Sequence, residues 1–250
     1  MTSPVTSHAA FDRIAPHYRY LWDDSDAGRL QRNAVWRFVQ PLLRVGDRIL
    51  DLGCGTGEDA VRFARHGVRV TGIDASAEMV RIARSRGVDA RVHRIEESGD
   101  LQLSLDGAIS IFGALNCVPD LSALREPLAE MIAPGGYLAI CVMGRFCLWE
   151  TIWYLLHGDP RKAARRWKGR ASSSLGLKIY YPSMKEITNS FAPAFRLVSS
   201  AGIGILVPPS FVRGLSNTWL RRFDTIDRRI AACPAVAGLG DHRILVFRRV

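Results

Sequence analysis

The sequence predicts an α/β fold, a doubly wound parallel sheet with helices on both faces. Residues 49–74 read, in order, as an apolar strand, a glycine-rich loop, a helix and a second apolar strand that ends in Asp74. Apolar strands then alternate with helical segments along most of the chain, which is typical of βαβ units. A chain of 250 residues that is 48% hydrophobic is long enough for one such domain with a helical addition.

The N-terminal region comes before the first strand. Residues 1–9 are polar, and we expect them to be disordered. From Ala10 the aromatic and apolar residues follow a helical spacing that Pro16 interrupts. We therefore expect a short helix, a turn and a second helix over residues 28–43.

The glycine-rich loop and the acid after it predict a nucleoside site. Gly53, Gly55 and Gly57 follow a strand over residues 48–52, and glycine allows a sharp turn on which a ligand lies directly against the backbone. An acid at the end of the second strand, here Asp74, suits both hydroxyl groups of a ribose. A tight turn that binds nothing is the alternative.

The acids beside the loop indicate which nucleoside binds. The glycine spacing is G-x-G-x-G, whereas a dinucleotide site has G-x-G-x-x-G, and Asp51 and Glu58 flank the loop. Carboxylates at these positions repel a pyrophosphate. They suit the ammonium group of an amino acid and tolerate a sulfonium.

The remaining elements of the core follow in the same alternation. Ser76 is expected to cap a helix that Gly87 ends. The next predicted elements are strands near residues 90–95 and 107–112, a helix over residues 121–132 and a strand that ends at Met143. At the C-terminal end we expect a strand over residues 195–206, an amphipathic helix over residues 219–230 and a last strand over residues 242–249.

The alternation breaks between residues 144 and 189, where we expect a helical insertion. The spacing of Trp149, Ile152, Trp153 and Leu156 gives one apolar helix face, which either roofs a pocket for an apolar or aromatic acceptor or packs in the core. A second helix begins after it and carries the basic residues of 161–170. This run is either a solvated face or a contact for an anionic substrate, lipid or carrier protein.

The motifs resemble those of a known enzyme family. DLGCGTG at residues 51–57 and GIDAS at residues 72–76 resemble motif I and the following acidic motif of the class I S-adenosylmethionine-dependent methyltransferases. FDRIAPHY at residues 11–18 is similar to the segment that folds over the cofactor in small-molecule members. The resemblance implies a Rossmann-like sheet of seven strands, mostly parallel with an antiparallel last strand. It also implies lid helices over residues 1–45, a core over residues 46–143 and 190–250, and a substrate-recognition insertion over residues 144–189.

The resemblance also implies a set of cofactor contacts. S-adenosylmethionine is expected at Tyr18, Asp51, Gly53, Cys54, Gly55, Gly57, Asp74, Ala75, Met79, Ile95, Glu96, Phe112 and Gly113. Tyr18 either contacts the methionine end of the cofactor or packs the lid, and Met79 lies against adenine or in the helix core. Members of the family usually have an acidic residue near adenine after the third strand. The segment RIEES departs from that pattern, so Ile95, Glu96 and Glu97 are all candidates for this contact.

The acceptor side is less specific. The expected substrate contacts are Asn116, Met143, Arg145, Trp149, His157 and Tyr180. Asn116 either holds a substrate hydroxyl or amine or caps the turn before Pro119. A hydroxyl acceptor needs a base, for which His17, His157 and Tyr180 are candidates, and none of them is assigned as catalytic.

Composition bounds the cellular setting. No apolar run has the length of a membrane helix, and the N-terminus lacks the features of a signal peptide. Five cysteines without a CxxC pair predict reduced thiols in a cytoplasmic enzyme, with no metal site. The net charge of +10 indicates a solvated basic surface, with nucleic acid or peripheral contact with an anionic membrane as the alternatives. The oligomeric state stays open.

The sequence therefore predicts a methyltransferase that acts on oxygen, nitrogen or carbon of an apolar or aromatic small molecule. The alternatives are a methyltransferase that acts on RNA or a lipid headgroup, and a non-catalytic cofactor-binding partner subunit.

Overall fold

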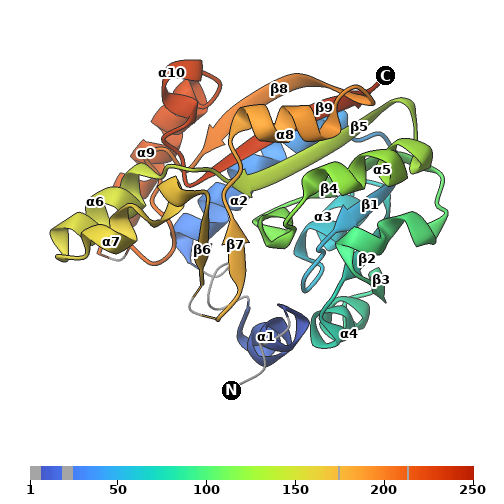
Figure 1. Ribbon diagram of the computed structural model, residues 1–250, viewed down its shortest axis with the longest axis horizontal. Coiled ribbons are helices and arrows are strands. Elements are labelled where there is room, and N and C mark those ends of the chain that lie inside the picture. The colour runs from blue at the N-terminus through green and yellow to red at the C-terminus, as the bar shows by residue number, and fades with distance from the viewer. Residues whose placement is uncertain (1–6, 19–24, 174, 213) are drawn as a thin grey trace.

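Seven strands form one sheet in the computed structural model, which describes residues 7–18, 25–173, 175–212 and 214–250 (Figure 1). The strands are β1 (Arg48–Leu52), β2 (Arg69–Asp74), β3 (Asp89–Val92), β4 (Leu105–Ser110), β5 (Ile132–Met143), β8 (Phe195–Ile203) and β9 (His242–Arg249). Their order is β3-β2-β1-β4-β5-β9-β8. β9 pairs antiparallel with both β5 and β8, and the other pairs are parallel. The predicted fold class is confirmed.

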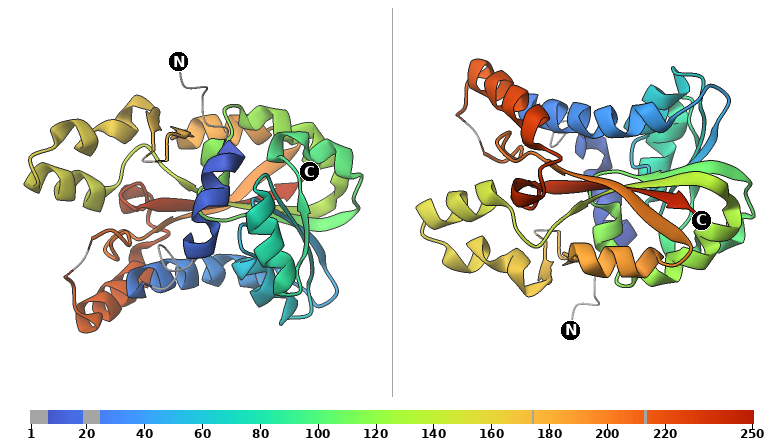
Figure 2. Two further views of the ribbon diagram at one scale, coloured as in Figure 1. Left: turned by 90° about the horizontal axis from the view of Figure 1, so that it is seen from below. Right: turned by 90° about the horizontal axis from the view of Figure 1, so that it is seen from above.

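Helices cover both faces of the sheet (Figure 2). α2 (Asp26–Val39), α3 (Glu58–Ala64) and α9 (Asn217–Ile230) lie on one face, and α5 (Arg125–Met131) and α8 (Met184–Phe191) lie on the other. α4 (Ala77–Ser85) packs against β2, β3 and α3. Along β5, Leu138 and Ile140 face one hydrophobic cluster while Tyr137 and Ala139 face the other. This burial on both sides explains why the strand is apolar over residues 137–142.

Short helical turns complete the core. They are η1 (Ala15–His17), η3 (Gln40–Leu42), η4 (Ile95–Leu101), η5 (Ala114–Cys117), η6 (Leu121–Leu124) and α10 (Pro234–Ala237). Ile95, expected in the third strand, instead begins η4, because β3 ends at Val92. No helix in the described part of the chain is long and apolar enough to cross a membrane.

The N-terminal helix α1 (Ser7–Ile14) lies across the end of the sheet, between α4 and a small hairpin (Figure 1). Asp12 Oδ1 accepts hydrogen bonds from Ser76 Oγ at 2.6 Å and from Glu78 N at 3.1 Å, which fixes α1 to the start of α4. The helix begins at Ser7, so the expectation of disorder is wrong for residues 7–9. Residues 1–6 lie outside the described residues.

The insertion is less helical than expected. α6 (Leu148–Leu156) has its predicted place, but the basic run divides into α7 (Pro160–Ala163) and η7 (Arg165–Lys168). The strands β6 (Arg170–Ser172) and β7 (Lys178–Tyr180) follow and pair antiparallel. Ser173 closes their turn, because its Oγ accepts a hydrogen bond from Leu177 N at 3.1 Å. The expected boundaries of lid, core and insertion stay predictions.

Candidate functional site

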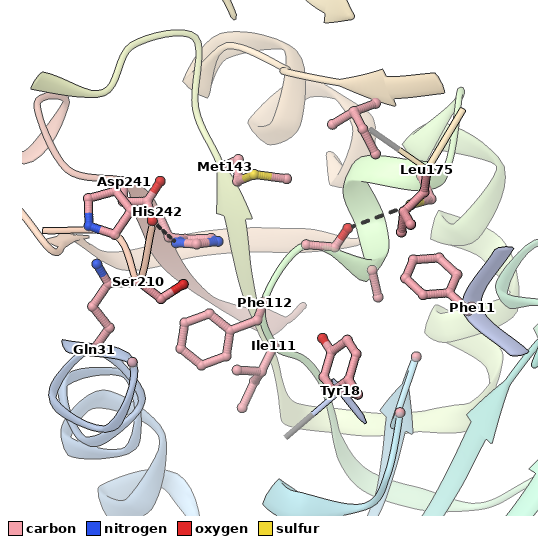
Figure 3. A pocket seen from close by; sticks show the side chains of 18 of the residues that line it. Phe11, Tyr18, Gln31, Ile111, Phe112, Met143, Leu175, Ser210, Asp241 and His242 are labelled. Carbon is pink, nitrogen blue, oxygen red and sulfur yellow. Dashed lines mark hydrogen bonds and ion pairs between the residues drawn. The ribbon is translucent and has the colours of Figure 1, made fainter. Parts of the chain in front are cut away.

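A cavity of about 380 Å³ opens where the parallel strands end (Figure 3). The strand order reverses between β1 and β4, and in open α/β sheets ligands bind outside the carboxyl ends of the strands at such a point. Because β9 is antiparallel, its first residue meets the last residue of β5, and His242 pairs with Met143. The cavity therefore has one wall made of strand ends and another made of a strand start.

The glycine loop forms the first part of the cavity wall. Gly53 has φ of +77°, and a Cβ there would lie 2.2 Å from the Cβ of Ala114. At Gly57, with φ of +76°, a Cβ would lie 2.9 Å from Val88. Side chains are excluded at both positions by conformation and by space. Gly53 and Gly55 line the cavity, so this part of the loop presents backbone to it.

Asp74 ends β2 and holds the loop in place. Its Oδ2 accepts a hydrogen bond from Gly55 N at 3.0 Å, and its Oδ1 accepts one from Ser76 N at 2.9 Å. Burial raises the pKa of this carboxyl above its ordinary value, although the two backbone donors oppose that shift. A carboxylate has about four acceptor positions, so Asp74 retains capacity for a pair of ligand hydroxyls.

Asp51 lies in β1 immediately before the loop and is almost fully buried. Its Oδ2 has no hydrogen-bond partner among the described residues. Burial raises the pKa of Asp51 well above its ordinary value, and Asp59 adds to this shift while Arg32 opposes it. A buried acceptor of this kind fits a cationic group of a ligand bound at the loop.

Most of the predicted cofactor residues line this one cavity. They are Tyr18, Gly53, Gly55, Asp74, Ala75, Met79, Ile95, Glu96, Phe112 and Gly113. Asp51, Cys54 and Gly57 are not among the lining residues, and the Cys54 side chain packs in the cluster between α3 and α4. The FDRIAPHY segment contributes Phe11 as well as Tyr18. All these contacts stay predictions.

Of the residues expected on the acceptor side, the structure brings only Met143 to the cavity wall. Asn116 is fully buried, and its amide joins two segments of backbone. Its Nδ2 donates to Met143 O at 3.0 Å and to Tyr180 O at 2.6 Å, while its Oδ1 accepts from Met143 N at 2.9 Å. This amide attaches the β6–β7 hairpin to the end of β5.

Asn116→Ala is expected to lower the free energy of unfolding by about 2–3 kcal/mol, because it leaves buried backbone groups of Met143 and Tyr180 without partners. Chemical denaturation measures the loss. Asn189→Ala, at an exposed position of α8, is the matched control and should stay within about 0.5 kcal/mol of the parent protein. Equal stability of the two variants would contradict the role given to the amide.

The other residues expected to contact the acceptor interact with protein groups outside the cavity wall. Arg145 pairs with Glu186 at 2.8 Å, and Trp149 Nε1 donates to Leu206 O at 2.8 Å. His157 is exposed and stacks on Trp153 with ring centroids 4.3 Å apart. The remaining candidates, Tyr180 and the exposed His17, are also absent from the described wall of the cavity.

A cluster of charged residues that the sequence did not predict lines the half of the cavity beyond Met143. Its members are Glu150, Arg165, Arg166, Asp241 and His242. Glu150 accepts from Arg165 Nε at 2.7 Å and from Arg166 Nε at 2.9 Å. Arg166 also donates to the Asp241 carboxylate at 2.7 Å and to the Asp241 carbonyl oxygen at 2.8 Å. The two central arginines of the basic run therefore face inward.

Within this cluster, neighbouring charges shift the pKa values of Asp241 and Arg166. Burial disfavours the charged form of Asp241, but His242 and Arg166 hold the pKa of its carboxyl well below the usual range. Burial likewise works against a charged Arg166, and Asp241 and Glu150 nevertheless raise its pKa above the ordinary value. Asp241 and Arg166 are thus a buried ion pair whose charged forms stabilise each other.

An aromatic residue borders the same half of the cavity. Phe112 has φ of +59°, an uncommon conformation for a bulky residue that tends to occur at functional sites. Arg32 lies 4.8 Å from the centre of its ring, and Arg32 Nη1 donates to Asp59 at 2.6 Å. The cavity therefore joins a loop suited to a nucleoside with a half that combines apolar walls and fixed charges.

Comparison with known proteins places this architecture in a family. Residues 23–192 match a family model described as a methyltransferase domain. A ubiquinone biosynthesis O-methyltransferase of Xanthomonas oryzae pv. oryzae is 36% identical over 106 residues, which are 40% of this chain and 44% of that protein. The counterpart of Xanthomonas axonopodis pv. citri is 35% identical over 135 residues, which are 50% of this chain and 56% of that protein. The chain thus spans about half the length of these curated relatives.

Solved structures share the fold. An S-adenosylmethionine-dependent methyltransferase from Mesorhizobium loti has a TM-score of 0.60 at 18% identity, over 88% of this chain and 100% of that one. Geranyl diphosphate C-methyltransferase from Streptomyces coelicolor A3(2) has a TM-score of 0.62 at 16% identity, over 99% of this chain and 100% of that one. At these identities the likeness concerns the fold alone.

Proposed function

The chain belongs to the methyltransferase-domain family, and from that premise we propose that it transfers a methyl group from S-adenosylmethionine to oxygen, nitrogen or carbon of an apolar or aromatic small molecule. The family inferred from the glycine loop and Asp74 is confirmed. The bound cofactor supplies a methyl group on a good leaving group, the sulfonium. The protein's tasks are then to align the acceptor and to exclude water.

One observation carries the proposal: a single cavity contains most of the predicted cofactor contacts and an acceptor half. Gly53, Asp74 and Met79 line one part of it, and Phe112, Met143 and His242 line the other. In this arrangement Asp74 holds the ribose and Asp51 attracts the ammonium of the methionine moiety. Met143 would border the acceptor.

The size and walls of the cavity favour a small acceptor over RNA. About 380 Å³ lies within the usual range of small-molecule pockets, and α1 and the β6–β7 hairpin border it. The inward direction of Arg165 and Arg166 also removes two charges from the basic run that the RNA alternative needs. A reduced-thiol, cytoplasmic setting is part of the proposal, and the five cysteines are free.

Calorimetric titration tests the cofactor assignment. We expect S-adenosylmethionine and S-adenosylhomocysteine to bind with micromolar affinity and NAD not to bind, because the acids beside the loop repel a pyrophosphate. Binding of NAD alone would overturn the proposal. Methyl transfer from labelled cofactor to a panel of phenols, amines and enols then tests the activity, and a protein that binds cofactor but methylates none of them would support the partner-subunit alternative.

The same titration has an expected pH dependence. Because the pKa of Asp51 is raised, the free protein holds a proton there at pH values where an ordinary carboxyl is ionised. An ammonium favours the ionised form, so binding should release a proton and the affinity should rise from mildly acidic towards neutral pH. Titrations in two buffers of different ionisation enthalpy count the protons. Asp51→Asn should remove most of the release, whereas the exposed Asp120→Asn should retain it.

A further inference from the structure

We propose that His242, positioned by Asp241, is a catalytic base that takes the proton from a phenol-type hydroxyl acceptor. This inference rests on the proposed methyl transfer and specifies its acceptor. Both residues line the cavity, at the start of β9, and His242 is the register partner of Met143. A base at this position faces the half of the cavity that lies beyond the predicted cofactor contacts.

The orientation of His242 suits this role (Figure 3). Its Nδ1 lies 3.3 Å from Asp241 Oδ2, and the opposite edge of the ring points into the cavity. Phe112 packs against the ring edge-on, with ring centroids 5.2 Å apart at 86°. The His242 side chain is 12% exposed, so it is enclosed but reachable from the cavity. Catalytic contacts of this length commonly shorten when substrate binds.

Asp241 is itself held by Arg166. The Arg166 guanidinium donates to Asp241 Oδ1 at 2.7 Å and to the Asp241 carbonyl oxygen at 2.8 Å. These bonds leave Oδ2 directed at His242. His242 Nδ1 faces Oδ2 at 3.3 Å and has no hydrogen-bond partner among the described residues. When the proton of the neutral ring lies on this nitrogen, the Nε2 lone pair is available for a hydroxyl proton. Asp241 is therefore a positioning residue, and it stabilises the imidazolium that forms.

The other charges around the ring occur in compensated pairs. Arg166 and Arg165 both bind Glu150, which is 1% exposed, and Arg32 binds Asp59. Each of these arginines has a carboxylate beside it, which offsets the repulsion between the arginine and a protonated His242. The surrounding walls include Phe112, Phe211 and Ile179. An aromatic ring that carries a hydroxyl matches this combination of apolar walls and one base.

The reaction step balances without any further reactant. The hydroxyl proton moves to His242 Nε2, and an electron pair of the acceptor oxygen forms the bond to the methyl carbon. The carbon–sulfur electron pair leaves with the sulfur, which becomes a neutral thioether. His242 then returns its proton to solvent, and the products are a methyl ether and S-adenosylhomocysteine.

The first test measures ionisation of a bound phenol under conditions in which no methyl group can be transferred. 4-Nitrophenol is added to protein loaded with S-adenosylhomocysteine, at a pH below the phenol's own pKa, and the absorbance of the bound phenolate is recorded. We expect a phenolate band with the parent protein and with His66→Asn, the matched control at an exposed position after α3. The band should fall at least tenfold in both His242→Asn and His242→Gln.

Failure of the inference about His242 can be distinguished from failure of the proposed methyltransferase function. An unchanged band in the His242 variants, or a bound phenol that stays protonated in the parent protein, would overturn the inference. A phenol that does not bind at all would overturn the acceptor class. The proposed function fails by a different observation, the absence of S-adenosylhomocysteine binding in calorimetry, which does not depend on His242.

A second test uses the rate of methylation of phenols of graded acidity. His242→Asn should lower kcat about a hundredfold for a weakly acidic phenol and leave KM within a few-fold. The loss should shrink for nitrophenols, which are already ionised in solution and need no base. An equal loss across the series would indicate a structural role for His242 and contradict the inference.

Discussion

Asp74→Ala is expected to weaken binding of S-adenosylmethionine about a thousandfold. Each hydrogen bond from a ribose hydroxyl to a charged acceptor contributes about 1.5–3 kcal/mol, and Asp74 is positioned to accept two. The substitution also removes the acceptor for Gly55 N and Ser76 N, which shapes the loop. Calorimetric titration with S-adenosylhomocysteine measures the change, and Asp120→Ala, at an exposed position, is the control.

A ligand lacking one hydroxyl separates direct contact from distortion of the loop. The parent protein should bind the 2′-deoxy and 3′-deoxy analogues of S-adenosylhomocysteine about tenfold or more weakly than the natural ligand. In Asp74→Ala the same deletions should cost little, because the partner carboxylate is already gone. If the deletions are equally costly in both proteins, Asp74 does not hold the ribose and acts on the loop alone.

Much of the fold follows from local pattern. The strand over residues 48–52 and the last strand over residues 242–249 have their predicted bounds, because each is a short apolar run between clear breaks. The glycine loop was predictable for a similar reason, since positive φ angles and close approach at Gly53 and Gly57 require a residue without a side chain. These features depend on neighbours in the sequence.

The acceptor half of the cavity depends on contacts between residues that are far apart in the sequence, and most of its residues were not predicted. Arg165 and Arg166 occur in a basic run that has the composition of a solvated face, and only the buried carboxylates of Glu150 and Asp241 draw them inward. For Asn116 the sequence offers a substrate contact or a turn cap, and neither describes its bonds, because its backbone partners, Met143 and Tyr180, lie 27 and 64 residues away along the chain.

One signal in the sequence does point to His242. An antiparallel last strand in an otherwise parallel sheet begins at the edge where the other strands end. Residues at the start of that strand therefore belong with those at the carboxyl ends of the others. Asp-His immediately at the start of the predicted strand over residues 242–249 is a titratable pair directed to that edge.

Arg166→Met is expected to cost about 3–5 kcal/mol of unfolding free energy, because it leaves buried carboxylates without their main partner. The Arg166 side chain is 5% exposed and contacts both Glu150 and Asp241. Lys162→Met removes an exposed pair with Asp159 instead and should change stability by no more than about 0.5 kcal/mol. Urea denaturation of both variants measures the difference, and similar losses would contradict the role of burial.

The effect of Arg166→Met should depend on pH in a defined direction. Because the folded protein holds the pKa of Asp241 below the ordinary value of about 3.9, this group stabilises the fold above that pH and loses its contribution as the pH falls through the lowered pKa. Removing Arg166 raises the pKa of Asp241, so the gap between variant and parent should be largest near neutral pH and should narrow below about pH 3.9.

Replacing the whole buried group provides the decisive comparison. The triple variant Glu150→Met, Arg166→Met and Asp241→Leu removes both carboxylates of this buried group together with Arg166, and Arg165, whose side chain is 30% exposed, reaches solvent. Apolar replacement of a complete buried ion group is often neutral or stabilising, so this protein should recover most of the stability that Arg166→Met loses. It should nevertheless fail to ionise bound 4-nitrophenol, since His242 has lost Asp241. If the triple variant recovers the free energy of unfolding but does not ionise bound 4-nitrophenol, the buried charges are needed for proton transfer and not for the stability of the fold.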